Sequence, residues 1–156
     1  MKIVKDFMNK DVIYLSPEDT IFDAAKKLSQ SNIAGAPVVE KDKLVGVIST
    51  SDIIKFIDIK IGKLPRIDSP GLSTLLFALI QIQKIRSDFK DELKKISATK
   101  IRDVMTKNVI TISASATLVE AAELIEKHDV NRLPVVSEGK LVGIVARADL
   151  IKALVD

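Results

Sequence analysis

The sequence predicts an α/β (α+β) fold in which two copies of one β-α-β-β-α unit pack face to face about an approximate two-fold axis, with a long helical insert between them. An internal repeat is the first reason: KLVGVISTSD at 43–52 returns as KLVGIVARAD at 140–149, and the copies align without a gap over 4–55 and 101–152. Second, neither copy has enough elements to cover both faces of its own small sheet. Third, the stretch 72–96 between the copies contains no proline or glycine.

Both copies show the same order of elements, which the first copy illustrates. A β-branched run at 12–15 ends at Ser-Pro and is read as a brief strand or an extended lead-in. Thr20 can cap the helix that follows, with an acidic residue at the third helical position. Two β-branched runs, 33–39 and 44–48, surround a polar loop and predict a hairpin. A second helix is expected to begin at Asp52.

The domain boundaries follow from the repeat. We expect the first repeat in 1–60, a linker and helical insert in 61–100, and the second repeat in 101–156. Apolar residues recur every three or four positions over 72–96, which predicts one helix roughly 37 Å long at about 1.5 Å per residue. That helix packs on the module or on its twin in a homodimer, and we expect the homodimer. A membrane-surface anchor is disfavoured, because the acidic residues at 88–92 would face an anionic leaflet.

Composition excludes several classes of protein. Of the 156 residues 47% are hydrophobic, enough for a core, whereas the N-terminus is charged too early for a signal peptide and the longest apolar run is too short to span a bilayer. The absence of cysteine removes disulfides and thiolate zinc sites. We therefore expect a soluble, cytoplasmic protein with no membrane partner. The net charge of +3 is spread along the chain, so nucleic acid is possible as a partner but disfavoured.

Groups for catalysis or metal binding are scarce. The one histidine, His128, has no second ligand at metal spacing. Gly46 and Gly143 are single glycines inside predicted strands, and the sequence has no glycine-rich phosphate loop. We expect no enzyme activity, no catalytic residues, no metal site and no obligatory cofactor.

A cluster of polar residues follows the second strand of the first hairpin: Ser49, Ser51 and Asp52. One interpretation is local, with Ser49 capping the next helix and Asp52 favouring its positive end. The other is functional, since an ionised carboxylate can accept hydrogen bonds from both hydroxyls of a ribose. In the second copy Asp149 remains, but alanines replace both serines, so we expect the capping box to be lost there. The residue pattern by itself favours the local interpretation.

Several motifs of the two copies lie in register. They are Gly-x-x-Ser-x-x-Asp and its second-copy counterpart, the Ala-Pro-Val-Val and Leu-Pro-Val-Val strands, and the second-copy opening Val-Met-Thr-Lys-Asn-Val-Ile-Thr with its first-copy counterpart. Together they resemble a tandem CBS domain pair, the Bateman module, here as a stand-alone protein. The resemblance implies a regulatory module that binds adenosine-containing ligands such as AMP, ADP, ATP or S-adenosylmethionine between its halves. It implies a ligand sensor that signals to an unknown protein partner. An oligomeric scaffold with vestigial clefts and a nucleic-acid-binding CBS protein are the alternatives.

The resemblance also implies two unequal ligand clefts, each combining residues of both copies. The aspartate holds the ribose, and the segment before the Pro-Val-Val strand of the other copy holds the adenine. Arg132 matches a position that faces phosphate, a role that suits a guanidinium group. The first cleft comprises Ser49, Ser51, Asp52, Asn108, Ile110, Val130, Asn131 and Arg132. We expect the second cleft to be weaker, because it lacks the serines and has no opposing cation other than Arg147. It comprises Ile13, Ile33, Ala34, Gly35, Arg147 and Asp149.

Overall fold

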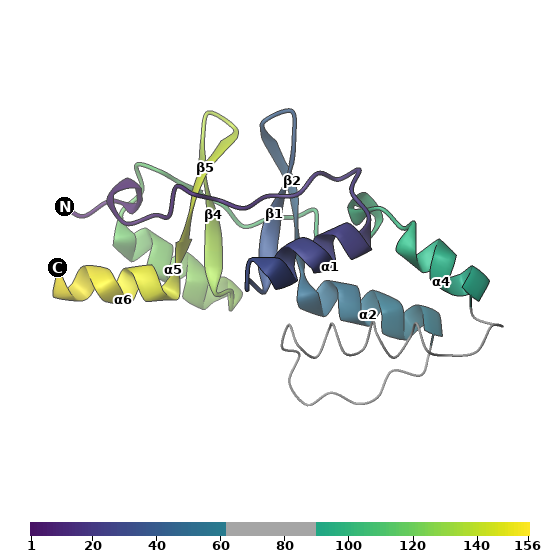
Figure 1. Ribbon diagram of the computed structural model, residues 1–156. Helices are drawn as coiled ribbons and strands as arrows, with labels where there is room; N and C mark the ends of the chain where they lie inside the picture. Colours follow the sequence, from purple (N-terminus) through teal and green to yellow (C-terminus); the bar gives the residue numbers. More distant parts are fainter. Residues whose placement is uncertain (62–89) are drawn as a thin grey trace. The chain divides into compact units, whose positions relative to one another are not determined.

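The computed structural model describes residues 1–61 and 90–156, which form two compact units (Figure 1). Among the described residues, the first-repeat unit contains 14–38, 45–61 and 90–107, and the second-repeat unit contains 1–13, 39–44 and 108–156. Most of the helix predicted at 72–96 lies outside the described residues. Its final part is helical, because α4 spans Lys90–Ser97.

The two repeats follow the predicted order of helices and strands. The first contains α1 (Ile21–Gln30), β1 (Gly35–Glu40), β2 (Lys43–Ser49) and α2 (Thr50–Ile61). The second contains β3 (Ile112–Ser113), α5 (Leu118–His128), β4 (Arg132–Ser137), β5 (Lys140–Ala146) and α6 (Arg147–Val155). The strands form a mixed five-stranded sheet in the order β1-β2-β5-β4-β3, in which β4 and β5 are antiparallel and β3 and β4 are parallel. The α/β class and the repeated unit are therefore confirmed.

The leading strand differs between the repeats. In the second repeat β3 pairs with β4, whereas in the first repeat the predicted run at 12–15 makes only one bridge, between Leu15 and Val38. The pairing ends because the next amide, that of Ser16, donates to the Asp19 carboxylate at 3.1 Å instead of to a neighbouring strand. The expected strand is thus a single bridge in an extended lead-in.

Each unit has its own apolar core. In α1 the side chains at i, i+3, i+4 and i+7 (Ile21, Ala24, Ala25, Leu28) are all buried, as the periodicity predicts. Both first helices begin with a capping box, in which the threonine hydroxyl accepts from an amide three residues on and the acidic side chain accepts from the threonine amide. The boxes are Thr20 with Asp23 and Thr117 with Glu120.

The repeats exchange their leading arms, an arrangement that the sequence did not indicate. The residues that open the first repeat pack on the second: the Val4 amide donates to the Ala116 carbonyl at 2.8 Å, and Asn9 pairs with Ile144 on β5. Val4 is fully buried in the core of the second-repeat unit. A short 3₁₀ helix, η1 (Val4–Asp6), forms the middle of this arm.

The reciprocal arm opens the second repeat and packs on the first. It contains η3 (Ile101–Asp103), and Ile101 is fully buried in the first-repeat core. The Ile101 amide donates to the Asp19 carbonyl at 2.8 Å, while Thr106 and Val47 exchange backbone hydrogen bonds of 2.9 and 3.0 Å. The arm therefore runs beside β2 two residues before Ser49.

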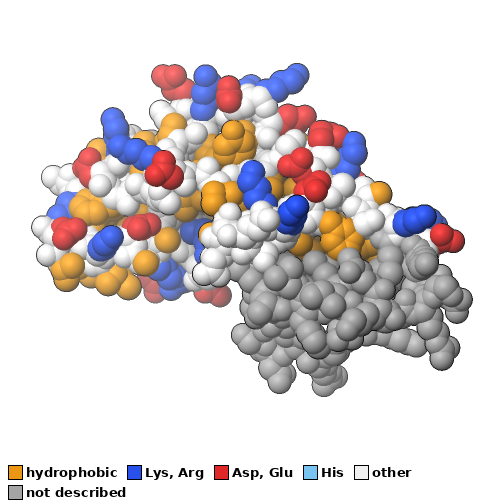
Figure 2. Space-filling view, in the orientation of Figure 1, with side chains coloured by type: hydrophobic (Ala, Val, Ile, Leu, Met, Phe, Trp, Pro, Cys, Tyr) orange, Lys and Arg blue, Asp and Glu red, His pale blue; other side chains and the backbone are white. Residues whose placement is uncertain are grey.

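No helix among the described residues has both the length and the apolar character needed to cross a membrane. Acidic and basic side chains are interspersed on the face shown in Figure 2, with apolar side chains between them.

Candidate functional site

The start of α2 holds the polar cluster predicted from the sequence. The Ser49 amide donates to Asp52 Oδ2 at 2.9 Å, and the Asp52 amide donates to Ser49 Oγ at 3.1 Å. These reciprocal bonds are a capping box, so the local interpretation of the two residues is confirmed. Asp52 keeps a second carboxylate oxygen, Oδ1, that accepts no hydrogen bond within 1–61 and 90–156. The cap therefore leaves part of the carboxylate available.

Strand and helix packing fixes the position of this cluster. Ile48 on β2 and Ile53 on α2 are both buried in the first-repeat core, one on each side of the polar residues. The Thr50 amide donates to the Ala34 carbonyl at 2.9 Å, which ties the helix start to the residue before β1. Next to Ala34, Gly35 lies close to β2: an added Cβ there would be 3.2 Å from the Ile48 carbonyl oxygen, a tight contact that glycine avoids.

The corresponding helix start in the second repeat keeps half of the capping box. The Ala146 amide donates to Asp149 Oδ2 at 2.7 Å, although alanine offers no hydroxyl in return. The expectation that this box is lost is therefore wrong for its carboxylate half. The reason is physical: that half needs only a backbone amide from the capping residue, and alanine supplies one as well as serine does.

Arg147 is held by its own repeat. Its Nε donates to the Val130 carbonyl at 3.2 Å, and its Nη2 lies 3.6 Å from Asp129 Oδ1. Its backbone amide donates to the Asn131 carbonyl at 3.0 Å. Asp129 has a left-handed backbone (φ 49°) at the end of α5, which brings the chain back toward the start of β4. The cation expected for the second cleft thus already has local partners.

The structure places the predicted site residues in two sets, one in each unit. The first-repeat unit contains Ile33, Ala34, Gly35, Ser49, Ser51 and Asp52, and the second-repeat unit contains Ile13, Asn108, Ile110, Val130, Asn131, Arg132, Arg147 and Asp149. Contacts join residues within a set: Ala34 bonds to the start of α2, and Asn131 bonds to the start of α6. The two clefts, which each combine both sets, stay predictions.

Exposure differs among these residues. Asp52, Ser49 and Ser51 are half-buried, as is Asp149, whereas Arg132, Asn131 and Asn108 are exposed. Arg132 begins β4, opposite Ala146 in the antiparallel register. The carboxylates of Asp52 and Asp149 are thus partly buried, whereas Arg132, the cation predicted to face phosphate, is exposed to solvent. Thr50, buried at 4% exposure between Ser49 and Ser51, was not predicted from the sequence.

One acidic residue outside these sets has a perturbed pKa because of its capping role. The Thr117 backbone amide, and secondly its hydroxyl, hold the pKa of Glu120 below its usual range, against a smaller opposing effect of desolvation. His128 is exposed, and no group of acidic, histidine or cysteine side chains suited to a metal occurs in the described parts of the chain.

Comparison with known proteins identifies the family. The CBS domain model matches residues 4–59 and 101–156, one match for each repeat. The chain belongs to the CBS domain family. It is 42% identical over 155 residues to the protein MJ1426 of Methanocaldococcus jannaschii, covering 98% of this chain and 91% of that one.

Two solved CBS structures with ligands are similar to this chain. The structure of CBSX2, a CBS-pair protein from Arabidopsis thaliana, in complex with AMP is 26% identical with a TM-score of 0.69, covering 99% of this chain and 97% of that one. The CBS domain pair of protein MJ0100, in complex with 5′-methylthioadenosine and S-adenosyl-L-methionine, is 26% identical with a TM-score of 0.65, covering 99% and 96%. The repeats of this chain therefore have the fold of CBS domain pairs.

Proposed function

We propose that this protein is a non-enzymatic regulatory module that binds an adenosine-containing ligand, AMP, ADP, ATP or an S-adenosylmethionine-like molecule, and signals to a protein partner. The observation that carries the proposal is the half-buried Asp52 carboxylate, whose Oδ1 accepts no bond from the described residues although Oδ2 serves the cap. An acceptor-only group at a helix N-terminus suits the two donor hydroxyls of a ribose. Similar CBS structures hold AMP and S-adenosylmethionine-related ligands.

The ligand contacts are proposed residue by residue. Asp52 accepts from the ribose hydroxyls, and Ser49 can still donate its hydroxyl hydrogen because its Oγ is only an acceptor in the cap. Ser51 adds a second hydroxyl, and Arg132 supplies a cation for a phosphate. The remaining proposed contacts in this site are Asn108, Ile110, Val130 and Asn131. A weaker second site would use Ile13, Ile33, Ala34, Gly35, Arg147 and Asp149.

Two features support a weaker second site. Ala146 and Ala148 stand where the first repeat has Ser49 and Ser51, so two hydroxyl groups are missing. In addition, Arg147 already donates to the Val130 carbonyl and pairs with Asp129, so a ligand would have to compete for it. The boundaries 1–60, 61–100 and 101–156 are proposed as the organisation of the module. The absence of cysteine supports the proposed cytoplasmic location.

A thermal-shift panel tests the function. AMP, ADP, ATP, S-adenosylmethionine, 5′-methylthioadenosine and NAD are added separately to the protein. A ligand that binds only the folded state stabilises it by about 2.7 kcal/mol at a hundredfold excess over Kd. A rise in Tm with at least one adenosine ligand, but not with adenine-free ribose 5-phosphate, supports the proposal. No shift with any compound would favour an oligomeric scaffold with empty clefts.

We also propose a homodimer. The predicted insert helix carries an apolar stripe in the sequence, and the described α6 exposes Ile151, Leu154 and Val155 at 64%, 83% and 84%. Exposed apolar surface of this kind is typical of association sites. Light scattering at micromolar concentration should give twice the chain mass, and a monomeric mass would contradict the proposal. On the face shown in Figure 2, basic side chains are interspersed with acidic ones and form no basic patch of the kind that nucleic acid favours.

A further inference from the structure

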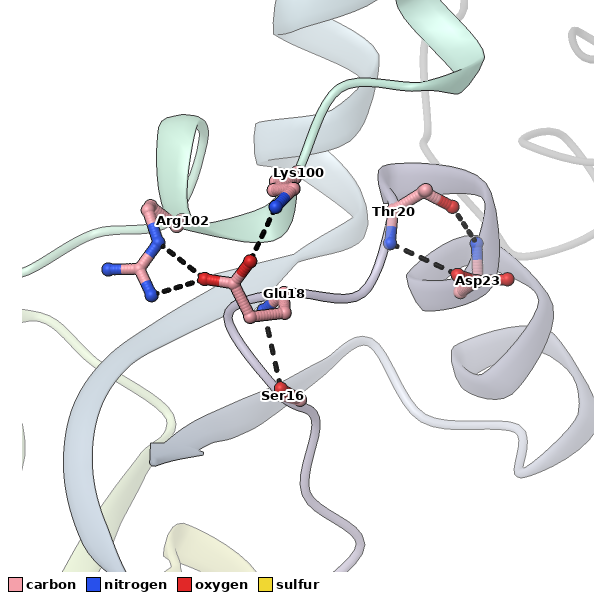
Figure 3. A network of polar contacts seen from close by, with 6 residues as sticks. All are labelled: Ser16, Glu18, Thr20, Asp23, Lys100 and Arg102. Carbon is pink, nitrogen blue, oxygen red and sulfur yellow. Dashed lines mark hydrogen bonds and ion pairs between the residues drawn. The ribbon is translucent and has the colours of Figure 1, made fainter. Parts of the chain in front are cut away.

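Ion pairs of Glu18 with Lys100 and Arg102 join the turn before α1 to the arm that opens the second repeat (Figure 3). Glu18 uses both carboxylate oxygens: Oε2 accepts from Lys100 Nζ, and Oε1 accepts from Arg102 Nε at 2.9 Å and from Arg102 Nη2. The Lys100 and Arg102 hydrogen bonds, in that order, hold the pKa of the exposed Glu18 carboxyl below its usual range. We call Glu18, Lys100 and Arg102 the clasp.

Backbone hydrogen bonds surround the clasp. The Glu18 amide donates to Ser16 Oγ at 3.3 Å, which shapes the turn, and the Arg102 amide donates to the Pro17 carbonyl at 3.1 Å. Thr20 and Lys100 form an isolated antiparallel bridge. Backbone hydrogen bonds therefore set the position of the arm on the turn, and the ion pairs of Glu18 add to its attachment.

The second repeat contains the same turn without the clasp. At the positions aligned with Ser16 and Glu18 it has Ser113 and Ser115, and the Ser115 amide again donates to the preceding serine hydroxyl at 3.3 Å. The arm on that side has Ile3 where the other has Lys100. Because the second repeat forms this turn with a serine at the position of Glu18, the folding of the turn does not by itself account for Glu18.

The clasped arm leads to the proposed ligand residues inside one unit. Beyond Arg102, Met105 packs over Gly46 on β2, where an added Cβ would lie 2.6 Å from its sulfur. Thr106 then exchanges backbone bonds with Val47, two residues before Ser49. The other end of the arm connects to α4, whose Ile96 is buried in the same core. One continuous chain of contacts thus runs from α4 through the clasp to the strand that carries the start of α2.

We propose that Glu18 is a positioning residue that couples the end of the insert to ligand binding: its ion pairs hold the 100–106 arm on β2 and so keep Ser49 and Asp52 in their ligand-binding arrangement. This inference rests on the proposed function. Coupling between two sites is reciprocal, so the ligand also strengthens the attachment of the arm. An interaction that shifts the last helix of the insert would thereby change ligand affinity, but only through the repeat that has a clasp.

The test compares variants that copy the second repeat: Glu18→Ser and Lys100→Ile. Hydrogen exchange on the full chain is expected to be faster at the Arg102 and Thr106 amides in Glu18→Ser than in the wild type. The Val4 and Lys5 amides, which occupy the equivalent arm, should be unchanged. AMP affinity, measured by calorimetry, should fall roughly twofold to fivefold, the range set by exposed ion pairs. High salt should weaken AMP binding by the wild type more than by Glu18→Ser.

Two controls separate a positioning role from a general structural one. Ser115→Ala, in the equivalent turn, should leave AMP affinity unchanged. Lys100→Ile added to Glu18→Ser should cost less affinity than it does alone, because the pair acts as a unit. Unchanged exchange at Arg102 and Thr106 in Glu18→Ser, or faster exchange with unchanged AMP affinity, would overturn the coupling. If the wild type binds no AMP, the proposed function fails and the coupling with it, while the exchange data still show whether the clasp holds the arm.

Discussion

Substitution of Asp52 separates its capping role from its proposed ligand role. Asp52→Ala removes the hydrogen bond that Oδ2 accepts from the Ser49 amide and a favourable charge at the N-terminus of α2. The lost hydrogen bond costs about 0.5–1.5 kcal/mol and the lost charge about 0.3–1 kcal/mol, together roughly 1–2 kcal/mol, which lowers Tm by about 2–4 °C per kcal/mol in a domain of this size. Asp149→Ala should cost a similar amount, because Asp149 accepts the matching bond from Ala146. Asp52→Asn keeps an acceptor oxygen and should lose only about 0.3–1 kcal/mol, the part due to its charge.

Ligand binding should not follow this order of stabilities. Asp52→Ala and Asp52→Asn should both weaken AMP binding by about tenfold or more, because a hydrogen bond to a charged group is worth about 1.5–3 kcal/mol. Asp149→Ala should change AMP affinity little despite its cost in stability. Urea denaturation and calorimetry on the same three variants measure the two quantities. Wild-type affinity in Asp52→Asn, or an equal loss of affinity in Asp149→Ala, would refute the reasoning.

Two further predictions concern stability. Gly46→Ala should destabilise the fold by about 1–3 kcal/mol, because the new Cβ would lie 2.6 Å from Met105 Sδ and 2.9 Å from the Thr106 carbonyl oxygen. An unchanged midpoint of urea denaturation would count against this packing. The lowered pKa of Glu120 means that its capping bond to Thr117 stabilises the fold above the usual glutamate range and is lost as pH falls through that lowered pKa. The free energy of unfolding of Glu120→Gln should therefore be lower than that of the wild type at neutral pH, and the difference should shrink as the pH falls. A difference that grows as the pH falls would contradict this prediction.

Local sequence signals predicted the repeated elements well. The apolar spacing of Ile21 and Leu28 indicated the buried face of α1, and Thr20 indicated its capping box, because both depend on residues close in the chain. The expected loss of the second capping box is wrong for the bond that Asp149 accepts, because this bond uses a backbone amide that every capping residue except proline possesses. A side-chain pattern does not report such a bond.

The exchange of arms could not be predicted from the same signals. Val4 and Ile101 occupy equivalent positions and both are buried, so either arm could pack on either repeat as far as the sequence is concerned. The choice depends on long-range backbone bonds, such as that from the Ile101 amide to the Asp19 carbonyl, which carry no side-chain signature. The clasp could not be predicted for the same reason. Glu18 and Arg102 lie far apart in the sequence, and only the packing of the arm brings them together.

Isothermal calorimetry of the wild-type protein with AMP tests the central claim most directly. It reports both whether an adenosine ligand binds and how many equivalent sites the chain offers. We predict saturable binding with one tight site per chain, followed at most by a much weaker second phase. Two sites of equal affinity would contradict the ranking of Asp52 above Asp149, and the absence of heat with AMP and with every other adenosine ligand in the panel would contradict the proposed function itself.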